Sequence, residues 1–356
     1  GHKLAAHSVK ANVRDAEEIL RYAREYHIDG IITDQTDIAV RSVAYVAEKM
    51  SLPGIGYETA CLFTDKYRMR ERCKELGIRT LKYKMVRSAD DAVAFLNELG
   101  GKAILKPVDN QGSKGVSLID SAEKMRVRFS EAMEYSKQKE ALVEEVATGR
   151  EFVAEGLTYN GRFQNLVVGD TYYFDIPDVF SATQRIFPTN ADAALRRRVE
   201  ELNEKIIVGF GLKQGISHSE FIMHGEDIIL IETAARGGGV FISSDLISLS
   251  TSLCTEEFLL QIATGTLKEV PAVRRDACAC CYMAFYLPVG VVEQVEGVAA
   301  VKALPYTHRH NLDGITAGLA THEYTDKTSR YFIIVSADTR DELNARVDQI
   351  RAALNG

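Results

Sequence analysis

The sequence predicts an α/β protein of two or three domains, for three reasons. Its 356 residues are too many for one small hydrophobic core. In the first sixty residues, short apolar runs alternate with amphipathic helical runs, a pattern typical of a parallel sheet with helices. After Pro271 the sequence becomes rich in strand-forming residues, which predicts a β-rich C-terminal part.

Composition and charge are those of ordinary soluble globular proteins, with 46% hydrophobic and 26% charged residues. Fifty acids against 43 bases give a net charge of −7 without a basic run, so we expect no nucleic-acid partner. No apolar stretch is long enough to span a bilayer, and no signal-peptide pattern opens the chain. We therefore expect a cytoplasmic protein without membrane contact.

Six cysteines are present, three of them in the run "ACACC" at 277–281. A metal site is one interpretation, but the run lacks a second Cys or His pair at the spacing of a zinc site. Free cysteines are usually buried, and this run leads directly into "YMAFYLPVG". We therefore predict a buried strand here.

The first sixty residues are predicted to contain two helices and one strand. Asp15 caps a helix over 16–28, and a short apolar strand follows over 29–37. A second helix covers 38–50 and ends in the turn at 51–56. A parallel α/β domain begins with a strand and its own helix, whereas this sequence begins partway through such a domain. We therefore expect this domain to be truncated, without its first βαβ segment.

The elements after Thr64 are predicted from hydrophobic periodicity, capping residues and turn residues. Predicted helices cover 64–78, 88–100, 121–139, 191–211 and 339–354. Predicted strands lie on both sides of a Gly-rich loop within 102–119, in a strand and a hairpin within 141–168, and at 80–86, 281–288, 318–324 and 330–337.

A further hairpin, "EFIMHGEDIILIE", is predicted over 220–232. If residues 225–227 form a three-residue loop, Glu220 lies directly opposite Glu232, with Cβ atoms roughly 4.5–5.5 Å apart. Carboxylates that close repel unless a cation lies between them, and oxygen ligands suit Mg²⁺. A two-residue loop would put the two glutamates on opposite faces, and a surface hairpin with solvated acids is the alternative. His218 shares the face of Glu220, where it either contacts substrate or is a hydrogen-bonded structural histidine.

The segment "ILKPVDNQGSKGVSL" combines a buried lysine with a glycine-rich loop. Lys106 ends an apolar strand, where burial of an isolated charge has a high free-energy cost. Backbone amides of the loop formed by Gly112, Ser113 and Gly115 could cover phosphates. The loop is no Walker A motif, because the GKS/T ending is absent and a strand follows. An ordinary hairpin turn is the alternative.

The segment "LVEEVATGREF" has the residues expected of an adenine-binding linker. Glu144 and Glu145 interrupt an apolar strand just before a glycine turn, and Glu151 follows. Exposed backbone groups of such a linker can read adenine, while the carboxylates accept the exocyclic amine and the ribose hydroxyls. Exposed glutamates at a strand end are the alternative explanation.

Together, the order and spacing of these residues resemble the ATP-grasp superfamily, in its carboxylate–amine ligase branch of amino-acid and purine-pathway enzymes. The resemblance covers residues 61–270 in motif detail, with a small lid lobe at about 80–145. It extends loosely to a partial pre-ATP-grasp α/β domain at 1–60 and to a C-terminal subdomain at 271–356. It implies an α+β ATP-grasp fold, preceded by a truncated Rossmann-like domain and followed by a β-rich subdomain.

The resemblance implies that one set of residues binds ATP. Two lysines hold the phosphates, a mobile loop covers them, two acids and two backbone positions read adenine, and a further acid binds ribose. In that order these residues are Lys66, Lys106, Gly112, Ser113, Gly115, Glu144, Glu145, Val146, Ala147 and Glu151.

The resemblance also implies the metal and catalytic groups. Glu220 and Glu232 would coordinate two Mg²⁺ ions, with Mn²⁺ as a substitute. Arg236 would face the substrate carboxylate and, with Lys106, offset charge on the transferred phosphoryl group.

The run "IETAARGGG" around the second metal-binding glutamate also bears on the substrate site. Gly238 and Gly239 are expected to leave space for substrate. Ala234 stands where many family members have an asparagine, so coordination by a side chain from that position is lost.

The activity implied is ATP-dependent ligation. A small-molecule carboxylate attacks the γ-phosphoryl group of ATP, and an amine then displaces phosphate from the acyl phosphate. A homodimer is the family's common state. The alternatives are an ATP-grasp enzyme that activates bicarbonate, formate or another small carboxylate, and a non-catalytic ATP-binding module. The intact set Lys106, Glu220, Glu232 and Arg236 argues against the module.

Overall fold

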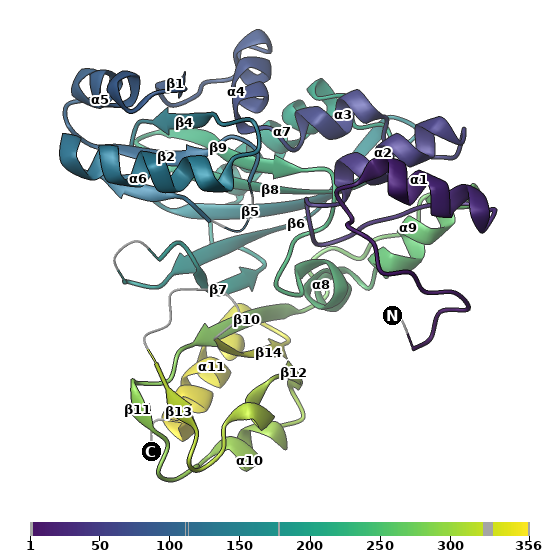
Figure 1. Ribbon diagram of the computed structural model, residues 1–356. Coiled ribbons are helices and arrows are strands. Elements are labelled where there is room, and N and C mark those ends of the chain that lie inside the picture. Colours follow the sequence, from purple (N-terminus) through teal and green to yellow (C-terminus); the bar gives the residue numbers. More distant parts are fainter. Residues whose placement is uncertain (1–2, 111, 113, 177–178, 323–329, 355–356) are drawn as a thin grey trace.

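Two antiparallel sheets and their covering helices form the computed structural model of the protein, which describes residues 3–110, 112, 114–176, 179–322 and 330–354 (Figure 1). The smaller sheet has the strand order β1-β4-β2-β3, and the larger has the order β12-β14-β10-β7-β6-β5-β8-β9. Within the described residues, no helix is both long enough and apolar enough to cross a bilayer.

The N-terminal part consists of three helices, α1 (Ala16–Glu25), α2 (Val40–Lys49) and α3 (Tyr57–Leu62). Asp15 caps α1 by accepting from the backbone N–H of Glu18, as predicted. The strand predicted over 29–37 is wrong: this segment forms neither helix nor strand. Among the described residues before β1, none forms a strand, so the segment has no sheet to join. Ile31 of this segment packs against α1 and α2 instead.

The smaller sheet and two helices form a lobe with its own core. Its strands are β1 (Tyr83–Val86), β2 (Ala103–Pro107), β3 (Ser117–Ile119) and β4 (Ala141–Glu144), and its helices are α5 (Ala89–Glu98) and α6 (Ala122–Tyr135). Ser88 and Ser121 cap the two helices by accepting a backbone N–H of the first turn. Apolar residues of α5 and α6 pack on β2, β3 and β4. The elements predicted for this region are confirmed.

The larger sheet is covered on both faces. Its strands are β5 (Glu151–Tyr159), β6 (Arg162–Tyr173), β7 (Ala182–Phe187), β8 (Gly215–His224), β9 (Asp227–Ala234), β10 (Ala279–Phe285), β12 (Thr307–His310) and β14 (Tyr331–Ala337). Because side chains alternate along a strand, Phe152 packs toward α4 (Lys66–Glu75) and α7 (Ala193–Gly209). Its neighbour Val153 packs toward the π-helical turn η1 (Ile242–Leu246), α8 (Ile247–Thr251) and α9 (Thr255–Ala263).

The C-terminal residues extend this same sheet. They add α10 (Val298–Lys302), the 3-10 turn η2 (Leu312–Gly314), α11 (Arg340–Leu354) and the small ribbon of β11 (Gly290–Val291) with β13 (Ala320–Thr321). In β10, Cys280 packs toward α8 and Cys281 toward α11, and both are fully buried. The buried strand predicted from the cysteine run is therefore confirmed.

Candidate active site

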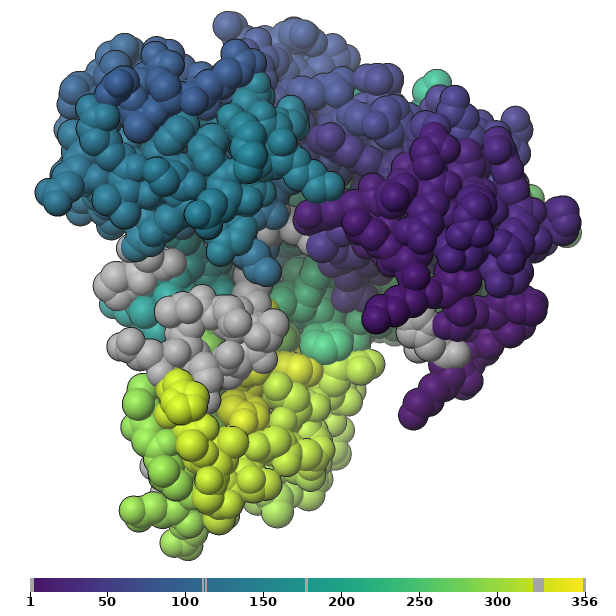
Figure 2. All heavy atoms as spheres, viewed as in Figure 1, coloured from purple at the N-terminus to yellow at the C-terminus, as the bar shows by residue number. Residues whose placement is uncertain are grey.

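A cavity of about 560 Å³ lies between the two sheets, with the N-terminal segment closing one side. Figure 2 shows the small lobe, the N-terminal helices and the C-terminal part meeting on one face of the molecule. Most of the predicted site residues line this cavity: Lys66, Lys106, Gly112, Glu144, Glu145, Ala147, Glu151, His218, Glu220, Glu232, Arg236 and Gly239. Residues separated by up to 173 positions in the sequence thus converge on one site.

Four predicted residues are placed differently. Gly115 lies beside the cavity, since a Cβ there would meet Pro107 and Tyr135. Val146 and Gly238 do not line the cavity either. Ser113 lies outside the described residues.

The two predicted metal-binding glutamates face each other across the β8–β9 hairpin. Glu220 pairs directly with Glu232, as predicted, but the predicted loop is wrong. His224 pairs with Asp227, which leaves a two-residue loop and would put the glutamates on opposite faces. A β-bulge between Glu220 and Phe221 inserts Ile231 as an extra residue and restores the register. The bulge also lets Ile231 and Glu232, which are neighbours in the chain, both line the cavity.

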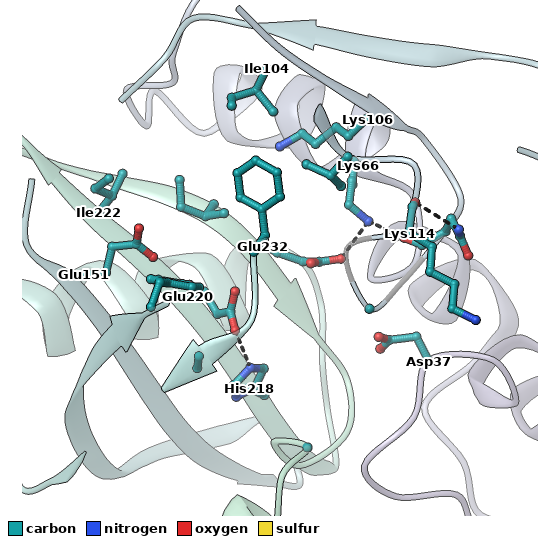
Figure 3. Close-up of a pocket in the computed structure, with 18 of the residues that line it drawn as sticks. Asp37, Lys66, Ile104, Lys106, Lys114, Glu151, His218, Glu220, Ile222 and Glu232 are labelled. Carbon is teal, nitrogen blue, oxygen red and sulfur yellow. Dashed lines mark hydrogen bonds and ion pairs between the residues drawn. The ribbon is translucent and has the colours of Figure 1, made fainter. Parts of the chain in front are cut away.

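Two lysines reach the cavity, Lys106 from β2 of the smaller sheet and Lys66 from the start of α4 (Figure 3). Lys66 begins α4, where Asp65 caps the helix by accepting from the N–H of Arg68. Its Nζ lies 2.8 Å from Glu232 Oε1 and donates to the carbonyl of Asn110 at 2.6 Å. Lys66, predicted to bind the ATP phosphates, and Glu232, predicted to bind Mg²⁺, thus form an ion pair with each other.

Lys106 is held by a buried cluster that joins three elements. Its ammonium forms an ion pair with Glu144, which also accepts from Arg70 Nε at 2.5 Å. Burial alone would raise the pKa of Glu144, but Arg70 and Lys106 outweigh it and lower the pKa to about 2. Burial, opposed by Glu144, lowers the pKa of Lys106. Both oxygens of Glu144 are therefore engaged by side chains of the protein.

A second chain of charged side chains contacts Glu220, one of the two predicted metal-binding glutamates. Arg185 Nη2 donates to Glu220 Oε1 at 2.6 Å, and His218 Nε2 lies 3.3 Å from the same oxygen. His218 Nδ1 contacts Glu155 Oε1, a carboxylate with no solvent exposure. Figure 3 shows His218 and Glu220 turned toward one another. His218 thus has hydrogen-bonding partners on both ring nitrogens while it also lines the cavity.

The far end of the cavity is built from the glycine-rich segment after β9 and from the N-terminal part. Arg236 donates to both oxygens of Asp37, at 2.9 and 2.8 Å. Burial alone would raise the pKa of Asp37, but Arg236 keeps it below its usual value. The backbone N–H of Gly237 donates to Asp34 at 2.8 Å, and that of Gly238 to Glu155 at 3.1 Å.

The two glycines predicted to leave space for substrate differ. A Cβ at Gly238 would lie 2.7 Å from Glu155 Oε1 and 2.8 Å from Ile242 Cβ. The prediction for Gly238 is therefore wrong, because protein side chains occupy that space. Gly239 lines the cavity, and a Cβ there would meet nothing closer than 3.7 Å.

Several residues of the site were missed by sequence reasoning. They form hydrogen bonds or ion pairs with residues of the site that are distant in sequence: Asp34, Asp37, Arg70, Glu155 and Arg185. A charged side chain inside an apolar strand was the available signal for Glu155 and Arg185. Asp34 and Asp37 had no such signal, because in the sequence they are polar residues at the end of a predicted strand.

Known proteins are similar to this chain in sequence over part of their length. A family model described as an ATP-grasp domain matches residues 100–245. The chain is 28% identical over 247 residues to alanine–anticapsin ligase of Bacillus subtilis, covering 63% of this chain and 51% of that protein. It is 26% identical over 276 residues to phosphoribosylamine–glycine ligase of Pyrococcus abyssi, covering 71% and 61%. The chain thus spans about half the length of the first of these relatives.

A solved structure shows the same fold over nearly the whole chain. The L-amino acid ligase from Bacillus licheniformis is similar with a TM-score of 0.79 at 21% sequence identity, covering 95% of this chain and 84% of that one. The α+β architecture predicted from the sequence is therefore confirmed. Residues 100–245 thus match an ATP-grasp domain, and the chain shares the fold of this solved ligase over nearly its whole length.

Proposed function

We propose that this protein is an ATP-dependent ligase that activates a small-molecule carboxylate as an acyl phosphate and joins it to an amine. The observation that carries the proposal is the convergence of Lys66, Lys106, Glu220, Glu232 and Arg236 on one cavity. Phosphoryl transfer needs positioning and charge neutralisation more than covalent chemistry. The two lysines would neutralise the phosphates, the two glutamates would bind divalent cations, and the arginine would bind the substrate carboxylate.

ATP would lie between the two sheets, with adenine at the linker after β4. The cavity there has apolar walls formed by Leu81, Ile104 and Ile222. We assign adenine recognition to Glu145 and to the backbone at 146–147, and treat Glu144 as the counter-ion of Lys106 and Arg70, because both its oxygens are engaged.

The ribose and the phosphates would follow along the cavity. Glu151 begins β5 and is the acid assigned to the ribose hydroxyls. Lys66 and Lys106 would bind the phosphates, and the backbone around Gly112 would cover them. Closure of this loop would exclude water from the reactive acyl phosphate.

The donor set at the hairpin fits two Mg²⁺ ions. Glu220 and Glu232 present carboxylate oxygens, the ligands that Mg²⁺ prefers, and each carboxylate now pairs with a side-chain cation. Among the described residues, no three His, Cys, Asp or Glu side chains form a metal cluster, so phosphate oxygens and water would complete the coordination. When bound, Mg²⁺ would neutralise phosphate charge.

Two steps complete the reaction. A carboxylate oxygen of the substrate attacks the γ-phosphorus, and the bond between that phosphorus and the ADP oxygen breaks. The amine nitrogen then attacks the acyl carbon, the C–O bond to phosphate breaks, and the amine loses a proton as phosphate leaves. Arg236 would hold the reacting carboxylate, and Lys106 would offset charge on the transferred group.

The relatives support amino acids as substrates. Their names describe ligases for alanine, glycine or L-amino acids. We therefore propose that at least one substrate of this protein is an amino acid.

Measuring ADP release tests the proposal. The full chain is incubated with MgATP and a panel of carboxylates, each with and without amines, and the coupled product is detected by mass spectrometry. We expect a carboxylate-dependent release of ADP that an amine increases, with one new amide per ADP. Release that no carboxylate–amine pair raises above background would refute the ligase function.

A further inference from the structure

A buried arginine from the C-terminal part lines the same cavity. Arg330 precedes β14 and is only 6% exposed to solvent. Its Nη1 donates to the carbonyl of Ala182 at 3.5 Å, and its guanidinium carbon lies 5.4 Å from the centroid of the Tyr282 ring. Its backbone carbonyl accepts from Asn311 at 3.1 Å, which fixes the chain at this point.

The charge of Arg330 differs from that of four other cations of the cavity in having no paired carboxylate among the described residues. Lys66, Lys106, Arg185 and Arg236 each form an ion pair with a carboxylate. Among the residues that the structure describes, Arg330 forms an ion pair with none. A buried charge without an opposite charge is costly, so this position is suited to an anion that arrives with a ligand.

Strand register places Arg330 near the metal-binding pair. Its aromatic partner Tyr282 pairs with Arg185 across β10 and β7, and Arg185 donates to Glu220. Tyr173 and Phe180 line the cavity beside these residues. The lysines assigned to ATP phosphates instead come from β2 and from the start of α4. Arg330 therefore reaches the cavity from a different wall than these lysines.

We propose that Arg330 binds the carboxylate of the amine substrate, and hence that this substrate is an amino acid rather than a simple amine. The inference rests on the proposed ligase function and refines it. The carboxylate to be activated is assigned to Arg236, at the end of the cavity formed with Asp37. Arg330 lies on another wall of the cavity than Arg236, so it suits a carboxylate that the reaction does not consume. Held there, an amino acid would keep its nitrogen free for attack on the acyl carbon.

Paired substrates test the inference. Each amino acid in the panel is compared with its carboxamide as the acceptor, in the wild type and in Arg330→Gln. Loss of a charged hydrogen bond predicts a roughly 10- to 100-fold lower kcat/KM for amino acids, mostly through KM. The KM for ATP and the kcat/KM for carboxamides should change by less than about twofold. Arg330→Lys should recover part of the loss, and Arg351→Gln on the exposed face of α11 is the control.

Three results would overturn the inference. Equal losses for amino acids and carboxamides would mean a structural role for Arg330. A loss confined to donors with a second carboxylate would assign the arginine to the donor. If the wild type had the same kcat/KM for amino acids and carboxamides, no contact between Arg330 and an acceptor carboxylate would be needed.

A binding measurement separates this inference from the ligase proposal. Calorimetry with the Mg²⁺ complex of a non-hydrolysable ATP analogue should show amino-acid binding that is at least about tenfold weaker in Arg330→Gln. If no amino acid binds, or if the variant binds equally well, the inference fails even where ADP release supports the ligase. If the wild type shows this binding but no ADP release, the ligase proposal alone fails.

Discussion

At the residue scale, the site is a set of opposite charges that neutralise one another. Lys66 pairs with Glu232, and Arg185 pairs with Glu220. Under the proposed function, MgATP would replace these pairs, since phosphates would take the lysine and cations the glutamates. Each side chain therefore has a partner before and after nucleotide binds, which keeps the cost of its burial low.

Replacing Glu232 with Gln should abolish turnover while sparing the fold. The change removes a charge needed for Mg²⁺, so we expect ADP release to fall by roughly three orders of magnitude. The side chain is 33% exposed, so the free energy of unfolding should change by less than about 1 kcal/mol in a urea titration. Glu226→Gln, in the exposed loop of the same hairpin, should retain full activity. Normal turnover in Glu232→Gln would disprove the metal assignment.

The two neighbouring glycines give a second prediction. Gly238→Ala would push a methyl group into Glu155 and Ile242, and shift the segment that carries Arg236. A misplacement near 1 Å predicts a roughly 100-fold loss of kcat/KM. Gly239→Ala would make only an ordinary van der Waals contact, 3.7 Å from the carbonyl of Gln35, and should lose less than about threefold. Steady-state kinetics of both variants provide the check, and equal effects would contradict this role of Gly238.

At the scale of elements, the Arg70–Glu144–Lys106 cluster joins α4, β4 and β2. These elements belong to both lobes, because α4 packs on the larger sheet. The cluster therefore sets the position of Lys106, the lysine proposed to bind phosphate, through contacts with Arg70 and Glu144.

Glu144→Gln should destabilise the protein in a pH-dependent way. Leaving two buried cations without their carboxylate predicts a loss of roughly 3–5 kcal/mol at neutral pH. The folded-state pKa of about 2 lies below the usual 4.5, so this stabilisation is complete above pH 4.5. It is lost as pH falls through the folded-state value. Urea unfolding of the wild type from pH 7 to pH 2 should approach that of the variant. A constant difference across this range would contradict the assignment, and Glu98→Gln, exposed on α5, is the control.

Sequence reasoning succeeded where the signal is local. Helix caps such as Asp15 and Ser88, and the strands on either side of the Gly-rich loop, follow from short-range patterns. The opposition of Glu220 and Glu232 was predicted for an incorrect reason, since a bulge and not the loop length sets it. A bulge has no reliable pattern in one sequence. The partners Asp37 and Arg185 lie in elements whose packing no local pattern reports.

At the scale of the whole molecule, we propose that 1–60, 61–270 and 271–356 are the functional units of the chain. The third unit is continuous with the second, because β10 pairs with β7 in the larger sheet. A buried carboxylate, Asp170, further ties them together. It accepts from Arg150 at 2.7 Å and from Thr189 at 2.7 Å, and lies 3.1 Å from Arg340 at the start of α11.

Asp170→Asn should loosen this connection. Removing a buried charge that faces two arginines predicts a loss of roughly 3 kcal/mol in the free energy of unfolding. Because α11 covers the β10–β14 region, amide hydrogen exchange should rise most in α11 and β14. Asp90→Asn removes an exposed pair with Arg126 and should cost less than about 1 kcal/mol. Uniform exchange across the chain would argue against a local connection.

The docking of residues 29–37 also affects how the protein is made. Gly30 packs so closely on α9 that a Cβ there would lie 2.5 Å from the carbonyl of Ala263, and Asp37 pairs with Arg236 at a separation of 199 residues. At roughly 5–20 residues per second, a ribosome adds Arg236 about 10 to 40 s after Asp37. During that interval Asp37 cannot pair with Arg236, and the end of the cavity that contains Arg236 cannot yet form. The active site is thus completed late in synthesis, after the residues that form both walls of the cavity have been added to the chain.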